Sequence, residues 1–221
     1  GLGVTENQIH GALIDSGMDS HPPKWTPEDV LRLSKRILQR GKPMMVAANK
    51  ADIASPEAIE RLAKEAGTIV VPTAAAYELA LRRAAKAGLI AYEPGASSFR
   101  ILDPGKLTAE QLLGLKKIEA FLVALGSTGV QPCIERAVRD LLNLIVVFPV
   151  EDETHWTDKK GNVLPDAFLV PRGSTAKDLA FRVHTDLGKG FIRAINARTR
   201  MVVGHDYAVQ DGDVIKIVAR A

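Results

Sequence analysis

Apolar positions in the first 143 residues follow two patterns, helical spacing and short continuous runs. Two runs, 43–48 and 68–72, lack the polar alternation of a half-exposed strand, which is typical of strands buried on both faces of a parallel sheet. A helix begun by Ser55 follows the first run, and an alanine-rich helix from Ala75 follows the second. This strand–helix–strand–helix order predicts half of a doubly wound α/β sheet. Further helices are predicted over residues 5–17, 26–40, 107–125 and 131–144.

From Leu144 onward the pattern changes to β-branched runs separated by turns. Two strands, a helix and at least two more strands are the outline of a β-grasp domain. The predicted fold class is therefore α/β, with a partial doubly wound parallel-sheet domain and helical insertion over 1–143, then a small α+β β-grasp domain over 144–221. The predicted strands of the second domain are 144–150, 167–170, 191–197 and 214–218, and its helix is 173–187.

Composition narrows the class of protein only slightly. The chain has 221 residues and is 46% hydrophobic, which supports sizeable cores, and its net charge of +3 is too small to assign a partner. A single cysteine excludes an internal disulfide and is typical of a reducing compartment. No apolar run reaches membrane-spanning length, and the N-terminus lacks a secretory apolar segment. We therefore expect a cytoplasmic protein with no membrane partner.

Polar chemistry begins where the first predicted strand ends, at Asn49, Lys50 and Asp52. In open α/β sheets, ligands lie beyond the carboxyl ends of the strands, so these side chains stand where a ligand would bind. A carboxylate has two acceptor oxygens and can take two adjacent donors in a fork. The alternative interpretation is a strand-to-helix loop that merely carries a helix cap.

Asn49-Lys50-Ala51-Asp52 resembles the Asn-Lys-x-Asp motif by which GTPases recognise guanine. The resemblance implies that Asp52 accepts the ring N–H and exocyclic amine of guanine, that Asn49 holds the base edge and neighbouring loops, and that the Lys50 stem lies along the base.

The segment after the second predicted strand, Thr73-Ala74-Ala75, is similar to the Ser-Ala-type motif of the same proteins, with alanine where serine is usual. There a backbone N–H contacts the guanine carbonyl, so these three residues are predicted to bind nucleotide. Thr73 is also a candidate helix N-cap, and both roles are compatible because amides at a helix N-terminus are free to donate.

Two GTPase motifs are absent from the printed sequence. It contains no Gly-x4-Gly-Lys-Ser/Thr loop for phosphates and no Asp-x-x-Gly motif for magnesium, and phosphoryl transfer depends on both. In GTPases these motifs precede the guanine motif, so the chain resembles the C-terminal part of a P-loop GTPase. The implied ligands are GTP and Mg²⁺, with the Mg²⁺ ligands expected in the preceding part. No catalytic or metal-binding residue is predicted within the printed sequence.

The run 169–180, closed by 210–215, resembles the TGS domain of threonyl-tRNA synthetases, stringent-response enzymes and certain GTPases. Together with the guanine motif and the helical stretches, it makes the whole chain similar to Obg-related GTPases of the YchF-like branch. YchF proteins proper commonly carry Glu at the last position of the guanine motif and prefer ATP, whereas Asp52 here favours GTP.

The charge distribution of the last third of the chain suggests an RNA partner. Seven basic and two acidic residues lie between Pro171 and Gly204, whereas residues 151–166 carry five acids and two lysines. Arg193, Arg198 and Arg200 are the predicted contacts to RNA or the ribosome, and a solvated surface is the alternative. Two functions thus remain open: a GTPase, considered as the whole protein, and a non-enzymatic RNA- or ribosome-binding module.

Overall fold

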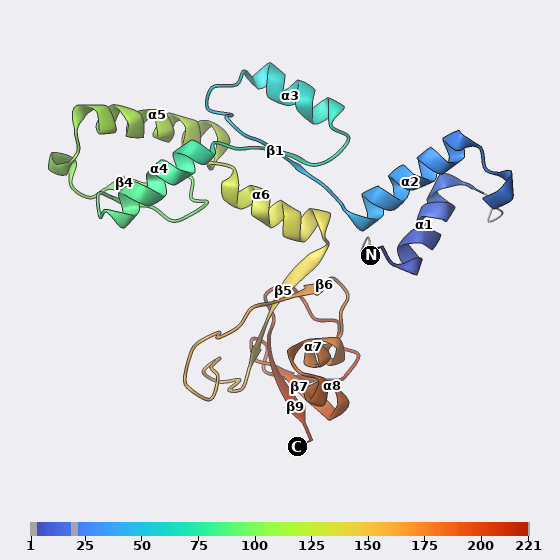
Figure 1. The fold of residues 1–221 in the computed structure, drawn as a ribbon. Coiled ribbons are helices and arrows are strands. Elements are labelled where there is room, and N and C mark those ends of the chain that lie inside the picture. Colours follow the sequence, from blue (N-terminus) through green and yellow to red (C-terminus); the bar gives the residue numbers. More distant parts are fainter. Residues whose placement is uncertain (1–3, 19–21, 221) are drawn as a thin grey trace. The chain divides into compact units, whose positions relative to one another are not determined.

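The structure is a computed structural model that describes residues 4–18 and 22–220. Residue contacts divide the chain into two units, Gly1–Ala137 and Val138–Ala221, and each is described by itself (Figure 1). The predicted domain limit between residues 143 and 144 stays a prediction. In the described ranges, no helix is both long and apolar enough to cross a membrane.

The first unit begins with a helical hairpin of α1 (Glu6–Ser16) and α2 (Pro27–Gly41). Thr5 and Thr26 close capping boxes at the two helix starts, which satisfies amide groups that would otherwise lack acceptors. Arg40 of α2 forms an ion pair with Asp15 of α1 at 2.5 Å. Both predicted helices are confirmed.

Two short parallel strands, β1 (Val46–Ala48) and β2 (Val70–Pro72), pair in register from Val46 opposite Val70 to Ala48 opposite Pro72. The helix α3 (Pro56–Glu65) follows β1 and contacts β2. The expectation that both strands are buried on both faces is wrong for β1, because Ala47 is exposed. Such burial needs helices over both faces, and α3 contributes no buried residue to this sheet.

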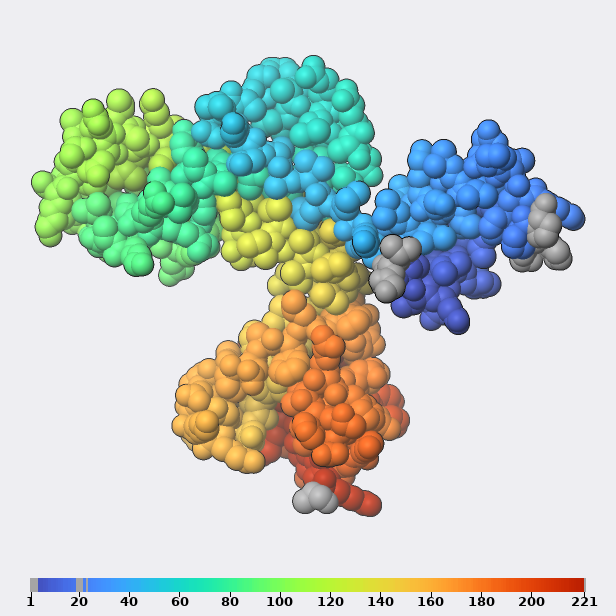
Figure 2. All heavy atoms as spheres, in the orientation of Figure 1, coloured from blue at the N-terminus to red at the C-terminus, as the bar shows by residue number. Residues whose placement is uncertain are grey.

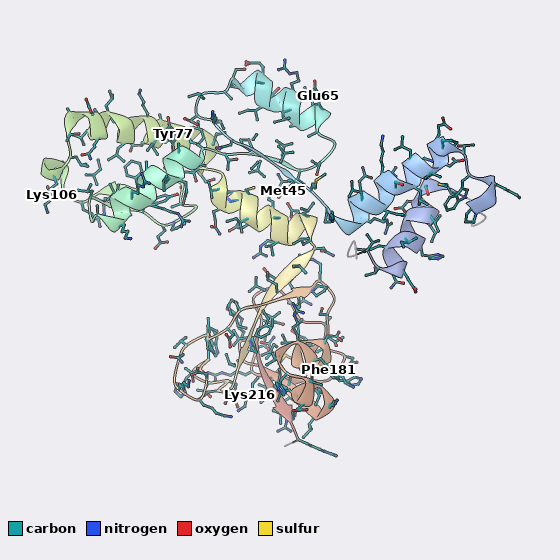
Figure 3. The ribbon with its side chains drawn as sticks, in the orientation of Figure 1. Met45, Glu65, Tyr77, Lys106, Phe181 and Lys216 are labelled. Atoms are coloured by element: carbon teal, nitrogen blue, oxygen red, sulfur yellow. The ribbon has the colours of Figure 1, made fainter. Side chains whose placement is uncertain are left out.

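The largest core of the first unit lies between α4 (Ala75–Lys86) and α5 (Ala109–Leu125). A two-stranded antiparallel hairpin of β3 (Ile90–Ala91) and β4 (Arg100–Ile101) adds to it. Tyr77, labelled in Figure 3, packs edge-on against Phe121 with ring centroids 5.3 Å apart. The two helices appear as adjacent green and yellow-green bodies in Figure 2. The buried residues of this core are Leu81, Ile90, Leu115, Ile118 and Leu122.

The predicted helix over 131–144 is shorter and less regular than expected. It consists of α6 (Val130–Arg136) followed by a π-helical stretch, Ala137–Leu141. The remaining helical pieces of the first unit are the 3-10 helices η1 (Pro22–Lys24) and η2 (Pro104–Lys106).

The second unit is a five-stranded mixed sheet in the order β6-β5-β9-β7-β8. Strand β5 runs parallel to β9, and the other pairs are antiparallel, as a β-grasp requires. The predicted helix 173–187 breaks at His184, whose backbone is extended. The elements are β5 (Leu144–Val150), β6 (Phe168–Pro171), α7 (Ala176–Val183), α8 (Thr185–Lys189), β7 (Phe191–Asn196), β8 (Met201–Val203) and β9 (Val214–Ala219).

The Asp211-Gly212 turn joins the beginning of β5 to the sheet. The Asp211 carboxylate accepts the Val146 N–H at 2.9 Å and pairs with Arg139, and the Gly212 N–H donates to the Val146 carbonyl at 2.7 Å. These bonds hold β5 beside β9, although β5 and the turn are more than sixty residues apart in sequence.

Candidate nucleotide-binding site

The loops that follow β1 and β2 lie side by side at the carboxyl end of the parallel pair. The Thr73 N–H donates to the Ala48 carbonyl at 3.0 Å, and the Ala51 N–H donates to the Thr73 carbonyl at 3.0 Å. Because both strands point the same way, their polar continuations meet at one edge. The structure thus brings together the two segments that sequence analysis assigned to one ligand.

Asn49 connects the two loops directly. Its side-chain Oδ1 accepts the Ala75 N–H at 3.2 Å. Lys50 adopts a left-handed backbone with φ 66°, and its carbonyl accepts the N–H groups of Ile53 and Ala54, each at 3.1 Å. This tight turn leaves the side chains of Asn49 and Lys50 exposed and buries Ala51.

The half-buried Asp52 carboxylate is free to accept hydrogen bonds. Within residues 4–18 and 22–220, no group donates to it and no cation pairs with it. The helix that follows is capped by Ser55, whose Oγ accepts the Ala58 N–H at 3.3 Å. The interpretation of this loop as a capping segment therefore accounts for Ser55 but not for Asp52.

The backbone amides of the second loop are largely engaged within the protein. Thr73 donates to Ala48, Ala74 donates to the Thr128 carbonyl at 2.8 Å, and Ala75 donates to Asn49. The N-cap of α4 is Ala74, and the Thr73 hydroxyl donates to the Val71 carbonyl at 3.2 Å. The alternative of Thr73 as the helix cap is therefore wrong.

Ala76 is a candidate donor that sequence analysis missed. In the described part of the chain its N–H has no acceptor, and the residue is exposed in the first turn of α4. The first amides of a helix lack intrahelical partners, so the start of the alanine-rich helix was the available signal. The neighbouring Ala75 N–H already donates to Asn49 Oδ1, at 3.2 Å.

The three arginines predicted to contact RNA are not equivalent in the second unit. Arg193 on β7 and Arg200 in the turn before β8 are exposed. Arg198 instead donates from Nε to the Gly212 carbonyl at 2.6 Å and lies over the Trp156 ring, 5.1 Å from its centroid. Arg198 thus holds the 151–166 loop to the sheet, while Arg193 and Arg200 keep their guanidinium groups in solvent.

The basic residues of the second unit do not share one face. Ala194, which follows Arg193, is buried in the core beneath α7. Successive residues of a strand point to opposite faces, so Arg193 lies on the face opposite α7. The exposed cations Lys177 and Arg182 are on α7 itself. The charge asymmetry in the sequence therefore divides between two faces of the domain.

The acidic loop 151–166 is held by local bonds. The side-chain hydrogen bond from His155, together with the backbone N–H groups of His155 and Thr154, lowers the pKa of Asp152 to about 2. Glu153 pairs with Lys216 of β9 (Figure 3 labels Lys216). The described residues include no cluster of His, Cys, Asp and Glu that could hold a metal ion.

Two family models match this chain. Residues 47–152 match the "Obg-like GTPase YGR210-like, G4 motif-containing domain", and residues 155–219 match the TGS domain. The first match contains both loops of the candidate site, and the second covers most of the β-grasp unit.

Known relatives extend the match over the whole chain. An uncharacterized GTP-binding protein of Methanocaldococcus jannaschii is 51% identical over 223 residues, which cover 100% of this chain and 56% of that protein. The ribosome-binding ATPase YchF of Buchnera aphidicola is 27% identical over 79% of this chain and 43% of its own length. The crystal structure of a GTP-binding protein from Pyrococcus horikoshii matches with a TM-score of 0.77 and 48% identity, over 99% of this chain and 58% of its own. The chain therefore spans about half the length of these relatives, from 43% to 58%.

Proposed function

We propose that this chain, which belongs to the Obg-like GTP-binding proteins related to YchF, recognises the guanine base of a bound nucleotide through the loops after β1 and β2. One observation carries the proposal: a half-buried carboxylate, Asp52, has no partner among the described residues, and it follows a loop that is hydrogen-bonded to a helix N-terminus.

Each side chain has a role that follows from its chemistry. The two oxygens of Asp52 accept the ring N–H and the exocyclic amine of guanine as a charge-assisted fork. The N–H groups of Ala75 and Ala76 donate to the guanine carbonyl, with the Ala75 amide released from Asn49. The Lys50 stem covers the base, and Asn49 lies at the base edge once it has released Ala75. The two loops stay joined by the backbone bonds from Thr73 to Ala48 and from Ala51 to Thr73.

The same geometry disfavours adenine. Adenine has an acceptor nitrogen where guanine has its ring N–H, and it lacks the amine at C2; its own amine is at C6, where guanine has its carbonyl. An acceptor placed against the Asp52 carboxylate costs about 1–3 kcal/mol because both groups are left unsatisfied. GTP is therefore the proposed ligand, although the relative from Buchnera is named an ATPase.

Hydrolysis belongs to a longer protein in this proposal. The residues that bind the phosphates and Mg²⁺ would lie in a segment that precedes the guanine motif, and this chain spans 56% of its Methanocaldococcus relative. The chain would supply base recognition, and the preceding segment would supply the phosphate loop. GTP hydrolysis in the cytoplasm is the activity proposed for the whole protein.

The substitution Asp52→Asn in the longer protein tests the proposal. An amide replaces one acceptor by a donor, which meets the guanine amine donor to donor, whereas xanthine carries a carbonyl there. Affinity for GDP should fall by the equivalent of about 1–3 kcal/mol, and affinity for xanthosine diphosphate should rise. Asp206→Asn, at an exposed aspartate of the second unit, is the matched control and should change neither affinity.

Isothermal titration with the two diphosphates measures the effect. A wild-type protein that binds GDP no more tightly than xanthosine diphosphate would contradict guanine recognition. If the Asp52→Asn variant keeps the wild-type ratio of GDP to xanthosine diphosphate affinity, Asp52 does not contact the base.

A second function, binding of structured RNA or the ribosome by the β-grasp unit, has support of its own. Arg193 and Arg200 are exposed and free of ion pairs in the part of the chain that the structure describes, and a relative is named ribosome-binding. Contact would be chiefly with phosphates, so affinity should fall steeply with salt. This second function does not require GTP hydrolysis, so it would hold equally for a non-enzymatic RNA- or ribosome-binding module.

Charge reversal at Arg193 and Arg200 tests the second function. The double variant Arg193→Glu, Arg200→Glu should lose co-sedimentation with ribosomes at low salt, while Lys159→Glu, Lys160→Glu on the acidic loop should retain it. Arg198 is left intact because its contacts with Gly212 and Trp156 are structural. Equal binding by both double variants, with equal salt dependence, would contradict a role for these arginines.

A further inference from the structure

A buried carboxylate lies directly behind the nucleotide loops. Glu78, in the first turns of α4, is only 4% exposed. Its Oε1 accepts from Arg82 Nε at 2.6 Å, and its Oε2 accepts from the Tyr92 hydroxyl at 2.7 Å and the Thr128 hydroxyl at 2.5 Å. Three separate segments of the chain, α4 with Glu78 and Arg82, the segment of Tyr92 and the segment of Thr128, therefore meet at one carboxylate.

The network keeps Glu78 ionised although it is buried. Burial alone raises the pKa of Glu78, but the hydrogen bonds from Thr128, Arg82 and Tyr92 outweigh it and hold that pKa below its usual value. A buried charge with several donors is costly to disturb, because removal of one donor leaves an acceptor unsatisfied. The network is therefore a rigid support and not a solvated surface group.

Thr128 links this support to the second nucleotide loop. It is fully buried, and both its hydroxyl and its carbonyl form hydrogen bonds. Its hydroxyl donates to Glu78, and its carbonyl accepts the Ala74 N–H at 2.8 Å. Ala74 is the N-cap of α4, immediately before the two amides proposed to read the base carbonyl.

The neighbouring glycine shows how closely this segment packs on the loop. A Cβ placed on Gly129 would lie 1.9 Å from the Pro72 carbonyl oxygen and 3.0 Å from Thr73 Cα. The Gly129 N–H in turn donates to Ser127 Oγ at 3.1 Å. Residues 127–129 thus rest on the backbone of 72–74 without an intervening side chain.

We infer that Thr128 and Glu78 are positioning residues that hold the Ala75 and Ala76 amides at the base carbonyl, and that they thereby set the preference for purines with an oxygen at C6. This inference rests on the proposed function. Donors held in place before binding lose little freedom when the ligand arrives. Asp52 belongs to the other loop, so its contact with the base does not run through Thr128.

The choice of ligand separates the Asp52 contact from the contact made by the Ala75 and Ala76 amides. Inosine diphosphate lacks the exocyclic amine and therefore reports the Asp52 contact. The diphosphate of 6-thioguanosine keeps both N–H donors but replaces the C6 oxygen with sulfur, a weak acceptor, and therefore reports the amide contact. The ratio of its Kd to that of GDP measures the amide contact alone.

The test uses the longer protein with Thr128→Val, which keeps the side-chain shape and removes the hydroxyl. Wild-type protein should prefer GDP to 6-thioguanosine diphosphate by about threefold to tenfold, the size of one hydrogen bond. In Thr128→Val this preference should shrink toward one, while the preference for GDP over inosine diphosphate stays unchanged. Thr128→Ser, which restores the hydroxyl, should recover the wild-type ratio.

A second variant, Glu78→Gln, keeps the length of the side chain and removes its charge. Its ratio of the Kd for 6-thioguanosine diphosphate to the Kd for GDP should also shrink toward one. If Thr128→Val does not fold, this variant tests the inference in its place. Folded variants that keep the wild-type preference for GDP over 6-thioguanosine diphosphate would overturn the inference. A wild-type protein that binds GDP and inosine diphosphate equally would instead overturn the Asp52 assignment, and with it the proposed function.

Discussion

Replacing Gly129 with alanine should destabilise the first unit strongly, because the new Cβ has no space. Gly129 has φ +78°, and the added atom would lie 1.9 Å from the Pro72 carbonyl oxygen and 2.9 Å from its carbonyl carbon. These are backbone atoms at the end of β2, paired with Ala48 of β1. A rotamer change cannot relieve the contact, so the strand end or the loop has to move.

The magnitude follows from what such a movement breaks. A left-handed backbone costs alanine about 1–2 kcal/mol. Movement of the 72–74 segment weakens the Ala74–Thr128 bond and the Thr73–Ala48 bond, at about 1–3 kcal/mol for each buried group left unsatisfied. The total of about 3–8 kcal/mol is a large part of the usual stability of a domain.

Gly126, three residues earlier in the same loop, is the matched control. Its φ is +79°, and a Cβ there would meet nothing within 4 Å. Gly126→Ala should therefore lose only the conformational cost of about 1–2 kcal/mol. Urea unfolding followed by circular dichroism, with amide hydrogen exchange to identify which unit opens, measures both variants. Equal destabilisation by the two substitutions would refute the close packing of the 127–129 segment on β2.

Three further outcomes are expected. The folded pKa of Asp152, about 2, lies below its ordinary value of 3.8. The stabilising effect of this carboxylate is therefore present above about pH 4 and is lost as pH falls toward 2. His155→Ala should raise the Asp152 pKa toward 3.8 in an NMR titration, and an unchanged pKa would contradict this. Thr108→Ala, which removes the cap of α5, should lower the free energy of unfolding by about 1 kcal/mol, whereas Thr108→Ser should be nearly neutral in urea melts. Asp211→Ala should destabilise the second unit by about 1–3 kcal/mol, because the Val146 N–H loses its charged acceptor, and faster exchange of that amide is the measurement that checks it.

Local features of this fold follow from the sequence because their causes lie within a few residues. Thr26, Ser55 and Thr108 each accept an amide three residues ahead, so the helix starts were predictable. The strand–strand–helix–strand order of the β-grasp also came from short apolar runs and turn residues. Two-residue strands such as β3 and β4 are too short for any hydrophobic period to reveal.

Errors occurred where a distant part of the chain decides the local structure. The 43–48 run has the composition of a buried strand, yet Ala47 is exposed, because burial depends on which elements cover the sheet. The helix predicted through Leu187 breaks at His184, and the sequence there carries no proline or glycine to signal the break. Strand β8 was missed because it is defined only by pairing with β7.

The residues of the candidate site also fall into those selected from sequence and those found only in the structure. Sequence alone was enough to select Asn49, Lys50 and Asp52, because they follow an apolar run and resemble the guanine motif of GTPases. Glu78 lies within the alanine-rich helix and Thr128 between two glycines of the sequence, and sequence analysis selected neither. Only the tertiary structure places them together, fifty positions apart, because a buried carboxylate must collect its donors from whichever segments pack around it.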